Sequence, residues 1–169
     1  MESPKNLVLC MVFFVIISSS PTPTSADLIE DMCKKVPLYS QLCVSILQSD
    51  PHSVHVSDAK GLAGIVAEQA LAKAKETTVA INKLLQSTKE GWLKSDLTAC
   101  AGMYKAAVSE HLPKAINSIQ MNNISQAINL LTAASNDASD CEDGFEGAPG
   151  VSPIKDRNDA MSQLCIISN

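Results

Sequence analysis

Aromatic residues are scarce in this chain of 169 residues and make up 4% of it. Beyond the N-terminal segment, the aromatic residues are Tyr39, Trp92, Tyr104 and Phe145. So few rings do not form a stacking surface for sugars or nucleobases. The net charge of −5 also disfavours nucleic acid and anionic membrane surfaces as partners.

Motifs for catalysis and cofactor binding are missing as well. The glycine-rich stretch 144–150 lacks the Gly-Lys-Ser/Thr ending of a phosphate-binding loop, and no Gly-x-Ser-x-Gly nucleophile elbow occurs. The spacing of Cys33, Cys43 and the nearby histidines does not match a zinc finger. Acidic pairs are sequence neighbours, which point to different sides of a helix and cannot share acid–base work. We therefore expect no enzyme activity, no metal and no cofactor.

The N-terminus has the composition of a secretory signal. Lys5 precedes an apolar run over residues 7–17, and small residues follow up to Ala26. The run is shorter than the about 20 residues that a membrane span requires, so we expect a cleaved signal peptide, residues 1–26. The sequence thus predicts one soluble, secreted domain over residues 27–169, with no membrane contact after cleavage.

Two antiparallel helices between Leu97 and Phe145 organise the chain. Apolar residues recur at steps of three and four in each, which places one stripe on one helix face. The first stripe is Leu97, Ala101, Tyr104, Val108, Leu112, Ala115 and Ile119, and the second is Ala127, Leu131, Ala134, Ala138, Cys141 and Phe145. Residues 120–123 form a short bend that makes the helices neighbours. We expect a kink at Pro113 rather than a helix end.

Cys100 and Cys141 are expected to meet across this hairpin. They lie almost equally far along the chain from a bend at Asn122, and the difference amounts to about one helical turn. The two thiols should therefore form a disulfide. The sequon that begins at Asn123 falls at the same bend, where an N-linked glycan is easily accommodated, so Asn123 is a candidate glycosylation site.

Cys33 and Cys43 suggest a second, local disulfide. They lie on either side of Pro37, which ends a first helix capped by Asp27, so a bridge would join two short helices into a hairpin. Cys10 lies in the predicted signal peptide, so Cys165 is left over in residues 27–169. A buried small residue is the better interpretation of Cys165, although a bond to a second chain stays open.

The remaining helices complete a bundle. Ser57-Asp58 is expected to cap a long helix that ends near Ser87. Ser95-Asp96 is expected to cap the first helix of the hairpin, and Asn158 or Asp159 the last helix. No strand-like alternation occurs. The sequence predicts an all-α fold: an up-and-down four-helix bundle with an N-terminal helical hairpin, two disulfides and a monomeric state.

Several motifs spread over residues 27–169 carry a family resemblance. They are Cys33-Lys34-Lys35-Val36-Pro37 with Tyr39, Cys43-Val44-Ser45, Leu97-x-x-Cys100 with Tyr104, Ala127 through Cys141-Glu142-Asp143-Gly144-Phe145, and Ser152-Pro153. With these residues the chain resembles the plant invertase/pectin methylesterase inhibitor family. Within that family it is most similar to the invertase inhibitors that include the plane-tree pollen allergen.

The resemblance implies a four-helix bundle with an extended hairpin and the same two disulfide pairs. It also implies a secreted inhibitor, in the cell wall or the vacuole, that occupies the active site of invertase. Tobacco-type invertase inhibitors contact the enzyme through a Pro-Lys-Phe tripeptide, which is absent here. We place the target contact instead within residues 142–155, at Phe145, Pro149, Pro153 and Lys155.

Two alternatives stay open. The target could be pectin methylesterase, for which similar family members use helix faces, here drawn from residues 57–87 and 97–122. A different class of function would be a bundle that carries a small apolar ligand between its helices. The family also usually continues its last helix further than Asn169, so the last helix here is expected to cover less of the core.

Overall fold

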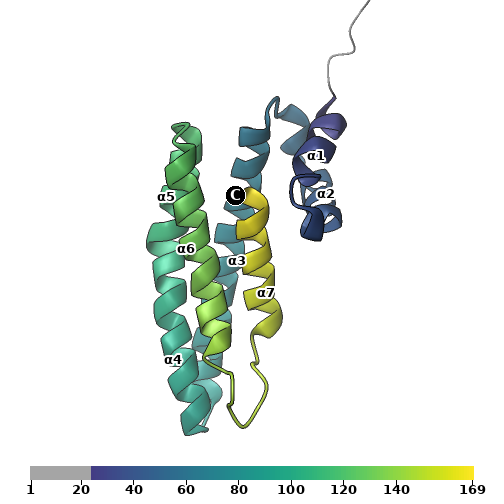
Figure 1. Ribbon diagram of the computed structural model, residues 1–169. Coiled ribbons are helices and arrows are strands. Elements are labelled where there is room, and N and C mark those ends of the chain that lie inside the picture. Colours follow the sequence, from purple (N-terminus) through teal and green to yellow (C-terminus); the bar gives the residue numbers. More distant parts are fainter. Residues whose placement is uncertain (1–23) are drawn as a thin grey trace, which may run out of the picture.

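The computed structural model describes residues 24–169, so the predicted signal peptide lies outside the described residues except for its end. Every regular element within this range is helical. None of its helices is both long and apolar enough to cross a membrane. The predicted all-α bundle with an N-terminal hairpin and two disulfides is confirmed (Figure 1).

A hairpin of two short helices precedes the bundle and lies to one side of it (Figure 1). It consists of α1 (Ser25–Cys33), the 3-10 turn η1 (Pro37–Tyr39) and α2 (Ser40–Ser49). A disulfide joins Cys33 to Cys43, whose Cα atoms are 5.5 Å apart, and both residues are buried. The bridge therefore links the end of α1 to the first turns of α2.

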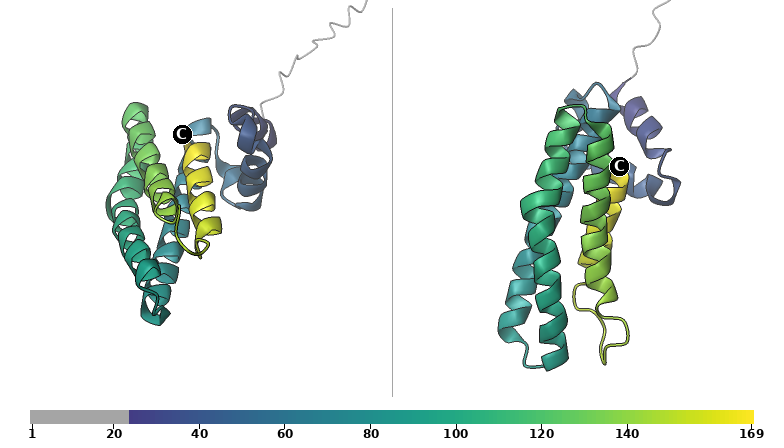
Figure 2. Two further views of the ribbon diagram at one scale, coloured as in Figure 1. Left: turned by 60° about the horizontal axis from the view of Figure 1, so that its bottom comes forward. Right: turned by 60° about the vertical axis from the view of Figure 1, so that its left-hand side comes forward.

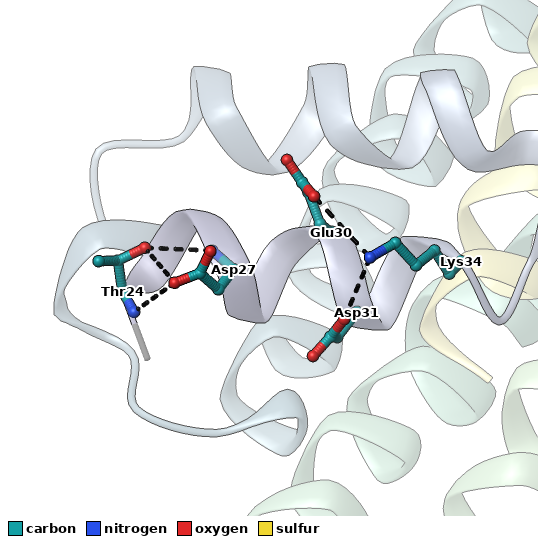
Figure 3. A network of polar contacts seen from close by, with 5 residues as sticks. All are labelled: Thr24, Asp27, Glu30, Asp31 and Lys34. Atoms are coloured by element: carbon teal, nitrogen blue, oxygen red, sulfur yellow. Dashed lines mark hydrogen bonds and ion pairs between the residues drawn. The ribbon is translucent and has the colours of Figure 1, made fainter. Parts of the chain in front are cut away.

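The cap of α1 differs from the sequence prediction. Thr24, not Asp27, is the N-cap: its hydroxyl accepts a hydrogen bond from the Asp27 backbone, and the Asp27 carboxylate accepts one from the Thr24 backbone at 2.9 Å (Figure 3). This reciprocal capping box satisfies two free backbone donors. The same figure shows exposed ion pairs of Lys34 with Glu30 and Asp31.

The bundle follows a short 3-10 turn, η2 (Ser53–His55). Its first member is α3 (Ala59–Ser87). The second is one continuous helical segment made of α4 (Gly91–Ala106), η3 (Ala107–His111) and α5 (Leu112–Gln120). The third and fourth are α6 (Ile124–Asp143) and α7 (Lys155–Ser168), and successive members run antiparallel. Figures 1 and 2 show these segments side by side. Asp58 caps α3 as predicted, because its side chain accepts a hydrogen bond from the Gly61 backbone at 2.8 Å.

The predicted stripes form the core. Ala101 and Val108 are partly buried, and every other stripe residue is buried. The long helix α3 adds Leu62, Val66, Ala70, Ala74, Thr77 and Ile81, and α7 adds Met161, Leu164 and Ile167. Many of these residues are alanines, which allow the helices to approach closely.

Two further predicted helix starts are wrong. The helix α4 begins at Gly91 rather than after Asp96, because Trp92 and Leu93 pack against the core and so extend the helix. The helix α7 begins at Lys155, and Asn158 lies buried in its first turn instead of capping it. Tertiary contacts therefore override the local capping signals at both places.

The helix continues through Pro113, as the stripe predicts. The π-helical turn η3 directly before it accommodates the proline. Proline lacks the N–H that would bond to the carbonyl of Ser109, and its ring crowds that carbonyl. One wider turn before the proline relieves this conflict without ending the helix.

Candidate functional site at the α6–α7 loop

The loop of residues 144–154 joins α6 to α7 at the end of the bundle where α3 meets α4 (Figures 1 and 2). Gly150 lies directly against Trp92: a Cβ there would be 3.1 Å from the indole ring. Gly147 has a φ of +76°, which favours glycine. The glycines thus allow a tight path across the bundle end.

Two apolar residues anchor the loop in the core. Phe145 is 6% exposed and Ile154 is 2% exposed. The Phe145 ring is therefore not exposed for the predicted contact with a target, and that contact stays a prediction. Phe145 continues the apolar stripe of α6 into the loop, and burial of its ring holds the start of the loop on the bundle.

Polar contacts hold the other end of the loop. One carboxylate oxygen of Glu142 accepts hydrogen bonds from the Ser152 hydroxyl and the Asn158 amide, each at 2.8 Å. The Asn158 carbonyl oxygen in turn accepts a hydrogen bond from the Tyr104 hydroxyl at 2.8 Å. Burial raises the pKa of Tyr104, so this hydroxyl keeps its proton.

The other predicted contact residues lie on the outer part of the loop and at the start of α7. Pro149, Pro153 and Lys155 are exposed, and Val151 between the prolines is 84% exposed. Lys155 forms an ion pair with Asp159 at 3.2 Å, and its hydrogen bond to this carboxylate raises its pKa. The loop therefore presents an apolar tip beside a cation.

A hollow of about 630 Å³ lies between this loop and α3. Three cations line it: Lys73 from α3, and Lys155 and Arg157 from α7. Its acidic residues are Glu76, paired with Lys73 at 3.1 Å, and Asp156. Cations from two elements thus gather beside the exposed Val151.

Sequence reasoning missed three of these residues. Arg157, the chain's single arginine, lies two positions after Lys155, and this closeness in sequence could have indicated that it belongs to the site. The exposure of Val151 follows from the path of the loop, which no local pattern reveals. Lys73 comes from a distant part of the sequence, and only the tertiary fold brings it to the loop.

Cys100 and Cys141 are joined by the second disulfide, with Cα atoms 4.8 Å apart. Both residues are buried, and the bond ties α4 to the last turn of α6, directly before the loop. Cys165 is a free, buried cysteine. The disulfide therefore restrains the helix from which the loop departs.

Asn123 lies at the opposite corner, where α5 turns into α6. It is exposed, and its side-chain oxygen caps α6 by accepting a hydrogen bond from the Gln126 backbone at 3.3 Å. Asn122 before it has a φ of 58°, which closes the turn. Glycosylation of Asn123 stays a prediction.

The two alternative functions would use other surfaces of the bundle. Val79 on α3 is 54% exposed and marks the long-helix face considered for pectin methylesterase. A separate groove of about 440 Å³ beside the end of α7 has a mostly apolar lining that includes Ile119, Ile128 and Ile167. Within residues 24–169, no group of three or more His, Cys, Asp or Glu residues is arranged to hold a metal ion.

Comparison with known proteins identifies the family. The model of the plant invertase/pectin methylesterase inhibitor family matches residues 27–169. The chain belongs to this family. A protein of Platanus acerifolia named "Putative invertase inhibitor" is 34% identical over 166 residues, which cover 95% of this chain and 92% of the relative. The pectinesterase inhibitor of Actinidia deliciosa is 30% identical over 170 residues, covering 97% and 90%.

A solved structure has the same fold. The crystal structure of a mutant form of a pectin methylesterase inhibitor from Arabidopsis aligns with a TM-score of 0.72 and covers 82% of this chain and 93% of the other. Sequence identity over this match is 17%, so the likeness concerns the fold alone.

Proposed function

We propose that the chain is a secreted, non-enzymatic inhibitor of invertase that acts by inserting its α6–α7 loop into the substrate cleft. Invertase is a glycoside hydrolase, and such enzymes carry a pair of carboxylates at the bond they cleave. The observation that carries the proposal is the apolar tip at Val151 flanked by Lys73, Lys155 and Arg157. Cations beside an apolar tip can pair with the carboxylates of such a cleft.

Rigidity supports the same proposal. The loop is held by buried Phe145 and Ile154, and the Cys100–Cys141 disulfide restrains the helix before it. A loop that is ordered before binding loses less conformational entropy when it enters a cleft. The expected location is the cell wall or the vacuole, because the N-terminus resembles a secretory signal and disulfides form in the secretory pathway.

Pectin methylesterase is the alternative target. A pectinesterase inhibitor with 30% identity is among the relatives, and the long helices α3 and α4 offer exposed faces. On this alternative the contact would include Val79 rather than Val151. The two targets therefore predict different surfaces.

A matched pair of substitutions tests the proposal. The oxidised protein, Val151→Asp and Val79→Asp are each titrated against a cell-wall invertase and a pectin methylesterase near pH 5. Both valines are exposed, so both variants should fold. We expect the native protein to inhibit invertase competitively with sucrose, and Val151→Asp to weaken inhibition by about 30-fold or more, as for a central contact residue.

Val79→Asp is expected to inhibit invertase like the native protein. Inhibition of the esterase alone, with loss in Val79→Asp, would move the contact to α3 and favour the alternative. Absence of inhibition of both enzymes by a folded, oxidised sample would contradict the inhibitor function itself.

A further inference from the structure

The composition of the α6–α7 loop favours mobility, yet the structure holds it in place. Residues 144–153 include three glycines and two prolines, and most of their side chains are exposed. A free loop of this kind would lose conformational entropy on binding, at roughly 1–2 kcal/mol per residue for the backbone. The contacts that order the loop beforehand therefore bear directly on affinity.

Glu142 connects the two ends of the loop. It lies in the last turn of α6, and its Oε2 atom accepts hydrogen bonds from Ser152 at the end of the loop and from Asn158 in α7. The Ser152 hydroxyl also accepts a hydrogen bond from the backbone of Ile154 at 3.4 Å. One carboxylate oxygen thus joins the helix before the loop to the chain after it.

Asn158 is itself fixed in orientation. It is 1% exposed, its amide nitrogen faces the Glu142 oxygen, and its carbonyl oxygen faces the Tyr104 hydroxyl. A carboxylate only accepts hydrogen bonds, so the amide can bond to it only through nitrogen. Tyr104 comes from the core of α4 and is fully buried. The network thereby reaches from the bundle core to the loop.

The opposite side of the loop is held by packing. Gly150 lies against Trp92, so displacement of the loop toward the bundle is blocked there. Between this contact and the hydrogen bond of Ser152 lies only Val151, which is 84% exposed. The two restraints flank the tip on both sides.

We propose that Glu142, Ser152, Asn158 and Tyr104 form a clasp that positions the α6–α7 loop for target binding, with Glu142 as its central positioning residue. The inference rests on the proposed function, since it assigns these residues to the same inhibitory loop. None of the four is required to touch the target. Their role is to keep Val151 in its binding position before the enzyme arrives.

The test removes the hydroxyl that ties the loop to Glu142. Ser152→Ala deletes one atom from a half-exposed side chain and should fold. Ser152→Thr keeps the hydroxyl and serves as the conservative rescue. Ser162→Ala is the matched control, because it removes a hydroxyl that bonds to Ser135 at 2.8 Å between α6 and α7 and that forms no hydrogen bond to Glu142, Ser152, Asn158 or Tyr104.

Hydrogen–deuterium exchange and inhibition of invertase are measured for all variants. Ser152→Ala should accelerate exchange over residues 146–153 only and weaken inhibition about tenfold, mainly through slower association, because fewer molecules hold the binding-competent loop. Ser152→Thr and Ser162→Ala should match the native protein in both measurements.

Three results would overturn the clasp while leaving the proposed function intact. They are native inhibition with unchanged exchange in Ser152→Ala, faster exchange with unchanged inhibition, or equal losses in Ser152→Ala and Ser162→Ala. If the native protein fails to inhibit invertase at all, the proposed function itself is overturned, and with it the clasp.

Discussion

At the scale of single residues, the thiol of Cys165 has an environment that suppresses its reactivity. Burial raises its pKa to about 12, with the nearby Asp137 carboxylate as a smaller cause. The thiolate is the reactive form, and it is nearly absent at pH 8. For the protein without its predicted signal peptide, residues 27–169, we predict no reaction with a thiol reagent at that pH and one reactive thiol per chain after unfolding. Rapid labelling of the native protein would show that Cys165 is accessible.

Tyr104 offers a second prediction at this scale. Tyr104→Phe removes the hydroxyl that donates to Asn158 and leaves a buried carbonyl oxygen without this partner. The expected cost is about 1–3 kcal/mol of unfolding free energy. Urea denaturation of the oxidised protein measures it. A stability equal to that of the native protein would mean that the hydrogen bond contributes nothing net.

The sequence located part of the candidate site at the level of residues. Pro149 and Pro153 in the loop and Lys155 at the start of α7 are exposed, and their contact with a target remains a prediction. Phe145 is the last member of the second stripe, and this pattern indicates the buried position that the predicted target contact did not take into account. Val151 could not be selected, since nothing in its neighbours distinguishes an exposed valine from a buried one.

At the scale of helices, a histidine–aspartate pair links η3 to α6. His111 Nδ1 lies 2.7 Å from an Asp137 carboxylate oxygen, and both side chains are mostly buried. Burial raises the pKa of Asp137, partly opposed by His111. The folded protein therefore binds this proton more tightly than the unfolded chain. The stabilising contribution of Asp137 is fully present in acid and is lost as the pH rises through its folded pKa.

Asp137→Asn isolates this contribution. The native protein should lose unfolding free energy as the pH is raised from 4 to 7, because its buried carboxylate ionises. The variant lacks this carboxylate, so its unfolding free energy minus that of the native protein should increase over the same range. Guanidinium unfolding at several pH values gives the difference. As a control, Asp137→Asn is also compared with its parent in a protein that carries His111→Gln. The pH-dependent difference should be larger there, because His111, which lowers the pKa of Asp137, is gone. A flat or reversed difference would contradict the assignment.

Element boundaries were predictable where local signals agree with packing. Asp58, one of the two predicted cap residues, caps α3 by accepting a hydrogen bond from the Gly61 backbone. The start of α1 was misplaced because Thr24 and Asp27 are both good capping residues, and only their reciprocal bonds decide between them. Asn158 was wrongly predicted as a helix cap, because its side chain instead forms hydrogen bonds with Tyr104 and Glu142.

At the scale of the whole molecule, the two disulfides should contribute unequally. The Cys100–Cys141 bond spans 41 residues and the Cys33–Cys43 bond spans 10, which correspond to about 4 and about 3 kcal/mol in the chain-entropy model. Replacing each pair by alanine should lower the unfolding free energy more for the first pair, which also links two bundle helices. Equal losses, or a larger loss for the hairpin pair, would contradict this order.

The central claim is that the α6–α7 loop enters the active site of invertase. Hydrogen–deuterium exchange of the oxidised protein, alone and with saturating invertase, tests it most directly. We predict slower exchange in the complex over residues 146–157 and no change in the hairpin of α1 and α2. Slower exchange confined to α3 and α4, with an unchanged loop, would contradict the claim and place the contact on the long helices.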